Sequence, residues 1–154
     1  MAILIDADAC PVVDTTLQCA KQKGLQVTLV CDASHVMERE GAKTVTVLKG
    51  ADSADFTLVN LIHPGDIVIT QDYGLAAMAL AKRAYALNQN GWEYTADNID
   101  SLLLARHTAR KVRMSGGRIK GPAKRSKEQD DAFRVALTLL VETSKSRIVD
   151  SMGS

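Results

Sequence analysis

The apolar positions of the chain fall into two alternating patterns. Short apolar runs, typical of buried parallel strands, are separated by stretches in which apolar residues recur at helical spacing. The predicted strands are 3–5, 26–31, 44–48, 67–70 and 86–88. The predicted helices are 12–23, 53–62, 75–84, 99–111 and 127–143. Because strand and helix alternate before residue 90, we expect right-handed crossovers and a mostly parallel sheet in an α/β fold.

The size and composition of the chain fit one soluble domain. Its 154 residues are 46% apolar and 24% charged, which is ordinary for a globular protein. We expect a single domain over residues 1–150 and a frayed tail over 151–154. No apolar run approaches the length of a membrane span, and the three cysteines form no C-x-x-C motif. These features predict a reduced cytoplasmic protein that does not enter a membrane.

Aspartates follow two of the predicted strands. Asp6 and Asp8 follow the first strand, and Asp72 follows the strand over 67–70. Asp52 and Asp55 lie at the start of the helix after the strand over 44–48. Because the carboxyl ends of parallel strands share one edge of a sheet, these side chains can converge there.

Converging carboxylates repel one another unless a cation neutralises them. Mg²⁺ and Mn²⁺ accept such hard oxygen ligands and retain waters, and they support phosphodiester displacement without a His, Ser or Cys base. Asp is also a preferred N-cap residue, so Asp52, Asp55 and Asp72 each have an alternative role at a helix start. What favours a metal site is the coincidence of Asp6 and Asp8 with Asp72 at two strand ends.

Basic residues are concentrated late in the chain. Nine of them, and no acidic residue, lie from Arg106 to Lys127. Gly116-Gly117 lies within this segment, and residues 115–127 are predicted to form a long loop. The residues predicted to contact nucleic-acid phosphates are Arg106, Arg110, Lys111, Arg113, Arg118, Lys120, Lys124 and Arg125. The alternative is a solvated surface with ordinary salt bridges.

Cys10 has two interpretations. At the first turn of a helix its thiol could be reactive through a lowered pKa. A cysteine beside a strand end is more often a small packing residue, and neighbouring Asp6 and Asp8 disfavour a thiolate.

Four strings of the sequence can be compared with known families. They are Asp6 to Pro11 (DADACP), Ala51 to Asp55 (ADSAD), Gly65 to Ala76 (GDIVITQDYGLA) and Arg113 to Arg118 (RMSGGR). Together they resemble the YaiI/YqxD family of uncharacterised bacterial proteins over nearly the whole chain. That family is similar, more distantly, to the PIN-like nucleases, in which an Asp ends the first strand and a Thr-x-Asp ends a later one. These positions fall here on Asp6 and on Thr70-Gln71-Asp72.

The resemblance implies a PIN-like three-layer α/β/α sandwich, acidic ligands for Mg²⁺ or Mn²⁺, and RNA cleavage. PIN-type enzymes usually add an acidic residue from a mid-chain helix, and here Asp52 or Asp55 would have to fill that place. Our first hypothesis is therefore a metal-dependent nuclease acting on RNA, with Asp6, Asp8 and Asp72 as catalytic residues. Its metal ligands would be Asp6, Asp8, Asp52, Asp55 and Asp72.

Two other functions fit the same fold. A non-catalytic module could bind RNA or phosphate through the basic segment without cleaving it. A small-molecule phosphatase or nucleotide-binding enzyme has less support, because the sequence contains neither a P-loop nor a G-x-G-x-x-G motif.

Overall fold

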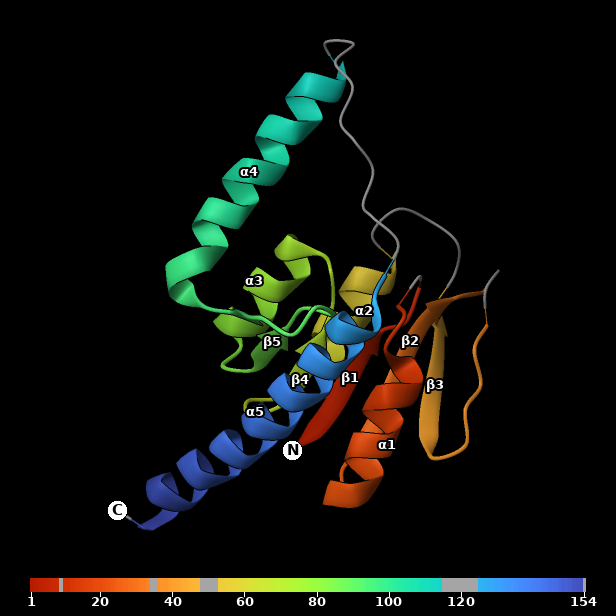
Figure 1. Ribbon diagram of the computed structural model, residues 1–154, viewed down its shortest axis with the longest axis vertical. Coiled ribbons are helices and arrows are strands. Elements are labelled where there is room, and N and C mark those ends of the chain that lie inside the picture. Colours follow the sequence, from red (N-terminus) through yellow and green to blue (C-terminus); the bar gives the residue numbers. More distant parts are fainter. Residues whose placement is uncertain (9, 34–35, 48–52, 115–124, 154) are drawn as a thin grey trace.

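The computed structural model describes residues 1–8, 10–33, 36–47, 53–114 and 125–153, with side chains described except at 53–56, 106–114 and 145–153. A six-stranded sheet has the order β3-β2-β1-β4-β5-β6 (Figure 1). The strands are β1 (Ala2–Asp6), β2 (Gln26–Asp32), β3 (Ala42–Val47), β4 (Ile67–Ile69), β5 (Tyr85–Leu87) and β6 (Glu93–Tyr94). Strands β1 to β5 pair in parallel, and β6 pairs antiparallel to β5.

Helices cover both faces of this sheet. They are α1 (Val13–Lys23), α2 (Ser53–Leu61), α3 (Tyr73–Ala81), α4 (Ala96–Met114) and α5 (Lys127–Gly153). Helices α1 and α5 lie on one face, whereas α2 and α3 lie on the other (Figure 1). The first half of α4 packs on this second layer, and its second half rises away from the sheet. The predicted α/β fold, with three layers and a mostly parallel sheet, is confirmed.

The two layers follow from the alternation of side chains along each strand. In β1, Ile3 and Ile5 face α1 and α5, where they share a core with Phe133 and Leu137. Leu4, between them, faces the other layer. The central strands are therefore apolar on both faces, which explains why their sequences read as continuous apolar runs.

The order of the strands places a topological switch point beside β1. The chain leaves β1 through α1 to form β2 and β3 on one side, then returns through α2 to form β4 on the other side. The carboxyl ends of β1 and β4 therefore border the crevice where open α/β sheets place their ligands.

Several predicted boundaries differ from the structure. Helix α4 begins at Ala96, not near Ile99, because Thr95 and Asn98 exchange side-chain-to-backbone hydrogen bonds at its start. Helix α5 continues to Gly153, so residues 151–153 are helical where a frayed tail was expected. The short strand β6 was not predicted at all. Residues 115–124 of the predicted loop lie outside the described residues, and no described helix has the length and apolarity of a membrane span.

Candidate functional site

A small hollow lies at the switch point, at the carboxyl ends of β1, β4 and β5. Its volume is about 30 Å³, which is room for about two water molecules or an ion. Its lining residues are Asp6, Asp8, Cys10, Ile69, Thr70, Gln71 and Gln89. The structure thus brings Asp6 and Asp8 together at the predicted edge, and it adds Gln89 from the end of β5.

Thr70 connects two of the predicted aspartates. Its hydroxyl donates a hydrogen bond of 3.0 Å to Asp6 Oδ2 and accepts one of 2.9 Å from the backbone N–H of Asp72. The Thr70 side chain is buried, so these bonds form away from bulk water. Thr70 therefore fixes the orientation of the Asp6 carboxylate at the wall of the hollow.

Asp72 caps helix α3. Its Oδ1 accepts hydrogen bonds from the backbone N–H groups of Gly74 (2.8 Å) and Leu75 (3.1 Å). This cap explains why α3 begins at Tyr73, before the predicted start at Leu75. The capping alternative is therefore confirmed for Asp72, which is not among the residues that line the hollow.

Asp8 is held by the neighbouring strand. Both oxygens of its carboxylate lie 3.2 Å from the backbone nitrogen of Asp32, the last residue of β2. Asp32 was not among the predicted site residues, because its sequence position was assigned to a turn. The contact orients Asp8 from β2 while Thr70 orients Asp6 from β4.

A row of polar residues continues along the strand ends, and its last member, Asn88, was not predicted from the sequence. Ile5 pairs with Ile69, and Ile69 pairs with Leu87, so Asp6, Thr70 and Asn88 follow in successive strands. The Asn88 amide donates to the Tyr94 hydroxyl (2.9 Å), which donates to the Thr70 carbonyl (3.1 Å). No signal in a single strand reveals this row, because it depends on the register between strands.

Gln89 lines the hollow and carries a buried oxygen without a hydrogen-bond partner among the described residues. Among the described side chains, its Oε1 is the buried polar atom that makes no hydrogen bond. An unsatisfied buried acceptor costs about 1–3 kcal/mol. The Asp6 and Asp8 carboxylates of the same lining are also acceptors, so the lining suits a cation or a hydrogen-bond donor.

Cys10 is a packing residue of this wall. Burial is the main reason that the pKa of its thiol is raised to about 11. The backbone N–H of Val12 lowers this pKa and the Asp6 charge raises it, but both effects are smaller than that of burial. Its side chain packs against the core shared by α1 and α5. The structure supports the packing interpretation over that of a reactive thiol.

Arg125 makes contacts within the chain that the sequence did not predict. Its Nη2 donates to the Gln89 carbonyl (2.7 Å), its Nη1 to Asn90 Oδ1 (2.8 Å), and its Nε to the Asp130 carboxylate. The guanidinium is engaged within the chain, and the Arg125 side chain is 19% exposed. Arg125 therefore acts as a structural clamp between the start of α5 and the loop after β5.

The remaining predicted residues are only partly described. Asp52 lies outside the described residues, and Asp55 lies in α2 without a described side chain. Arg106, Arg110, Lys111 and Arg113 lie in the second half of α4, again without described side chains, and Arg118, Lys120 and Lys124 fall outside the described ranges. Across the described part of the chain, no group of three or more His, Cys, Asp or Glu side chains is arranged to hold a metal ion.

The oxygen atoms of the residues that line the hollow nevertheless suit one hard divalent ion as ligands. Mg²⁺ is commonly bound through one or two carboxylates and keeps several waters. Asp6 and Asp8 supply two carboxylates, and the unsatisfied Gln89 oxygen adds a neutral donor of the same hard type.

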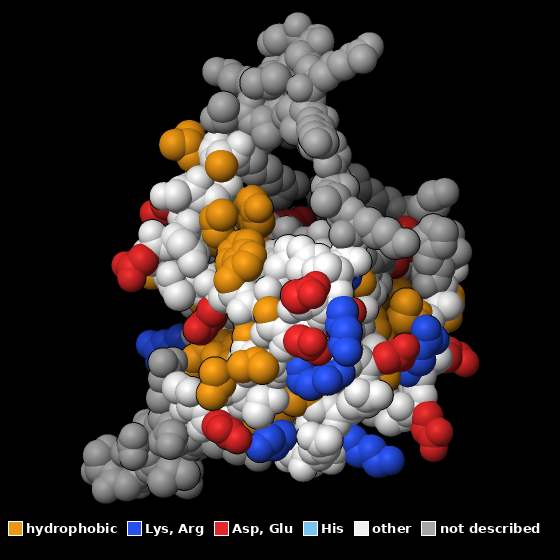
Figure 2. Space-filling model, in the orientation of Figure 1, with side chains coloured by type: hydrophobic (Ala, Val, Ile, Leu, Met, Phe, Trp, Pro, Cys, Tyr) orange, Lys and Arg blue, Asp and Glu red, His pale blue; other side chains and the backbone are white. Residues whose placement is uncertain are grey.

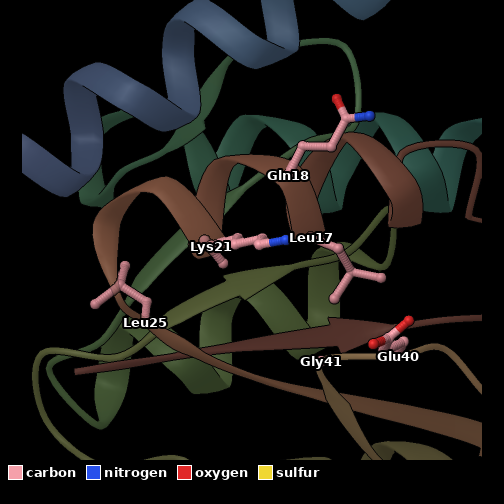
Figure 3. Close-up of a pocket in the computed structure, with 7 residues that line it drawn as sticks. Leu17, Gln18, Lys21, Leu25, Glu40 and Gly41 are labelled. Carbon is pink, nitrogen blue, oxygen red and sulfur yellow. The ribbon is translucent and has the colours of Figure 1, made fainter.

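A larger hollow of about 390 Å³ lies at the opposite edge of the sheet (Figure 3). It is bordered by α1 and by the amino ends of β2 and β3, with Leu17, Lys21 and Glu40 among its lining residues. In Figure 3 Gln18 points away from the sheet, while Leu17 points toward it. None of the predicted site residues lines this hollow.

Comparison with known proteins identifies the family. The family model described as "Uncharacterized BCR, YaiI/YqxD family" matches residues 4–143. A UPF0178 protein of Exiguobacterium sibiricum is 50% identical over 141 residues, covering 92% of this chain and 96% of that protein. A UPF0178 protein of Clostridium acetobutylicum is 46% identical over 147 residues, covering 94% and 99%.

A crystal structure of Rae1 (YacP) from Bacillus subtilis aligns with a TM-score of 0.44 and 16% identity, over 96% of this chain and 99% of that chain. The resemblance drawn from the four sequence strings is confirmed, while the further likeness to PIN-like nucleases stays a prediction. With a family model that spans nearly its whole length, the chain belongs to the uncharacterised YaiI/YqxD family.

Proposed function

We propose that the protein is a divalent-metal-dependent nuclease that acts on RNA. The observation that carries this proposal is the hollow at the switch point, where Asp6 and Asp8 lie together and a buried oxygen of Gln89 has no partner. Asp6 and Asp8 would hold the ion, with Asp52 or Asp55 as further ligands and Asp72 supporting Asp6 through Thr70. A bound Mg²⁺ or Mn²⁺ would supply an activated water and stabilise charge on the phosphate.

The residues of the chain prepare this chemistry by fixing the acceptors before substrate arrives. Thr70 holds Asp6, and the backbone N–H of Asp32 holds Asp8. Preorganised groups need not reorganise during the reaction, which is the main way in which sites of this kind lower a barrier. The hollow is far smaller than a nucleotide, so the phosphodiester would meet the site at its mouth.

The choice of a nucleic-acid substrate rests on charge, and the choice of RNA rests on the resemblance to PIN-like nucleases. Figure 2 shows basic and acidic side chains interspersed over the face that α1 and α5 cover, so this face presents no large field of one sign. The predicted phosphate contacts are instead on the second half of α4 and in residues 115–124, where the sequence carries basic residues and no acidic one. Such contacts bind the backbone and do not read bases.

The test is cleavage of single-stranded and double-stranded RNA in Mn²⁺. We expect Asp6→Asn to abolish cleavage without changing RNA affinity. Asp14→Asn is the matched control, because Asp14 is an exposed aspartate of α1 that pairs with Arg39. Asp14→Asn should cleave at the wild-type rate. RNA cleavage that survives Asp6→Asn would refute the proposal, and RNA binding without any cleavage would favour the non-catalytic module.

A further inference from the structure

The loop after β5 contributes one residue, Gln89, to the lining of the hollow. Gln89 follows Asn88, the last member of the polar row, and its Oε1 is buried without a hydrogen bond in the described part of the chain. The amide N–H of the neighbouring Asn88 donates a hydrogen bond to the Tyr94 hydroxyl. The Asn88 Oδ1 accepts one from the backbone N–H of Asn90 (2.9 Å). Gln89 is therefore the unsatisfied member of an otherwise bonded loop.

The surroundings of the Gln89 oxygen indicate what it meets. The Asp6 and Asp8 carboxylates that share the hollow are acceptors, and the Thr70 hydroxyl already donates to Asp6. These carboxylates cannot donate a hydrogen bond to the Gln89 oxygen. A cation, or the water molecules bound to a cation, can satisfy it. With a volume of about 30 Å³, the hollow admits such an ion and excludes a sugar or a base.

The loop that carries Gln89 is braced from α5. Arg125 donates to the Gln89 carbonyl and to Asn90 Oδ1, and its Nε binds Asp130 in the first turn of α5. Because one planar guanidinium makes all these bonds, it fixes the backbone at Gln89, beside the hollow that this residue lines.

We propose that Gln89 is a third oxygen ligand, beside Asp6 and Asp8, for the divalent cation, and that Arg125 is the positioning residue that holds it there. This inference rests on the proposed function for the identity of the site. It adds a neutral ligand from the loop after β5 to the carboxylates at the end of β1, and it gives Arg125 the role of supporting that ligand.

Calorimetric titration with Mn²⁺ alone tests the ligand. We expect Gln89→Leu to raise the Mn²⁺ Kd at least about tenfold, and Gln89→Glu to lower it about tenfold because it adds a negative charge to the site. The matched controls are Gln18→Leu and Gln18→Glu on the exposed face of α1, which should bind Mn²⁺ as the wild type does. Unchanged affinity in both Gln89 variants, or weaker binding by Gln89→Glu, would overturn the inference.

A double-substitution cycle tests the positioning role. Arg125→Lys keeps the charge but cannot make the three bonds, so it should weaken Mn²⁺ binding severalfold. If Arg125 acts through Gln89, then Arg125→Lys should add little to Gln89→Leu. Fully additive effects would refute the positioning role. Thermal midpoints without Mn²⁺ show whether each variant is folded.

Failure of this inference and failure of the proposed function give different results. If Asp6→Asn loses both Mn²⁺ binding and RNA cleavage while the Gln89 variants bind normally, only the role of Gln89 is wrong. If Asp6→Asn still cleaves RNA, the nuclease site lies elsewhere, whatever Gln89 binds.

Discussion

At the scale of single residues, the site depends on side chains that orient other side chains. The Thr70 hydroxyl accepts from Asp72 and donates to Asp6, so one threonine couples a helix cap to a candidate metal ligand. The backbone N–H of Asp32, at the end of β2, holds the carboxylate of Asp8. Residues that position ligands in this way usually matter almost as much as the ligands themselves.

Cys10 gives a prediction for alkaline pH. Its thiol has a pKa of about 11 in the folded chain, raised from 9.0 by burial. As the pH rises above 9, the unfolded thiol ionises while the folded one keeps its proton, so the free energy of unfolding falls. The slope from this group approaches about 1.4 kcal/mol per pH unit between pH 9 and 11. Burial also raises the pKa of Tyr94, to about 12, which adds a loss in the same direction above pH 10.

Urea unfolding at several pH values between 7 and 10 measures this effect. Cys10→Ala removes the thiol, so its free energy of unfolding should fall less steeply above pH 9 than that of the wild type. Parallel curves for the two proteins would show that Cys10 does not contribute to the pH dependence.

At the scale of elements, the turn between β5 and β6 is fitted closely to α5. Gly91 has a φ of +92°, and a Cβ added there would lie 2.7 Å from the Ala132 carbonyl oxygen. The atom in the way is helix backbone, which cannot rotate aside as a side chain can. We expect Gly91→Ala to lower the free energy of unfolding by about 3 kcal/mol or more, since overpacking adds to backbone strain.

Gly41→Ala is the control for this prediction. Gly41 has a φ of +84°, but a Cβ added there would meet no atom within 4 Å. Its substitution should therefore show the backbone strain alone, about 1 kcal/mol. Equal losses in urea unfolding for the two variants would mean that the contact with α5 is unimportant.

At the scale of the whole molecule, the layers could be predicted because each depends on local periodicity. The runs that became β1 and β4 are apolar on both faces, and their strand ends placed Asp6 and Asp8 at the correct edge. The end of α5 was missed because its apolar pattern fades after Val141, where Glu142 and Thr143 are followed by Ser144. β6 is too short for an alternating pattern to be visible.

The site itself could be predicted only in part, because its completion depends on contacts between distant segments. Strand register places Asn88 in line with Asp6 and Thr70, and Gln89 lines the hollow from the loop beyond. Arg125 is indistinguishable in the sequence from its basic neighbours, and its role is set by the loop after β5. Composition can indicate that a basic segment contacts an anion, but it cannot show which of its basic side chains instead bind within the chain.

The residues that line the hollow and the predicted phosphate contacts on α4 belong to different elements, which predicts that RNA binding and cleavage can be uncoupled. The second half of α4 rises away from the sheet in Figure 1 and carries Arg110 and Lys111. Replacing both by Gln should remove about two phosphate contacts. The slope of log affinity against log salt concentration for single-stranded RNA should then become shallower by about 1.4.

Fluorescence anisotropy between 50 and 200 mM salt, about the range over which such slopes are resolved, measures this slope in the non-cleaving Asp6→Asn background. Lys21→Gln with Lys43→Gln is the matched control, because it removes the same charge from exposed residues at the opposite edge of the sheet. That pair should keep the slope of the parent protein, since those lysines are remote from α4. An equal change in slope for both pairs would indicate a response to net charge, and would remove α4 as the RNA-binding element.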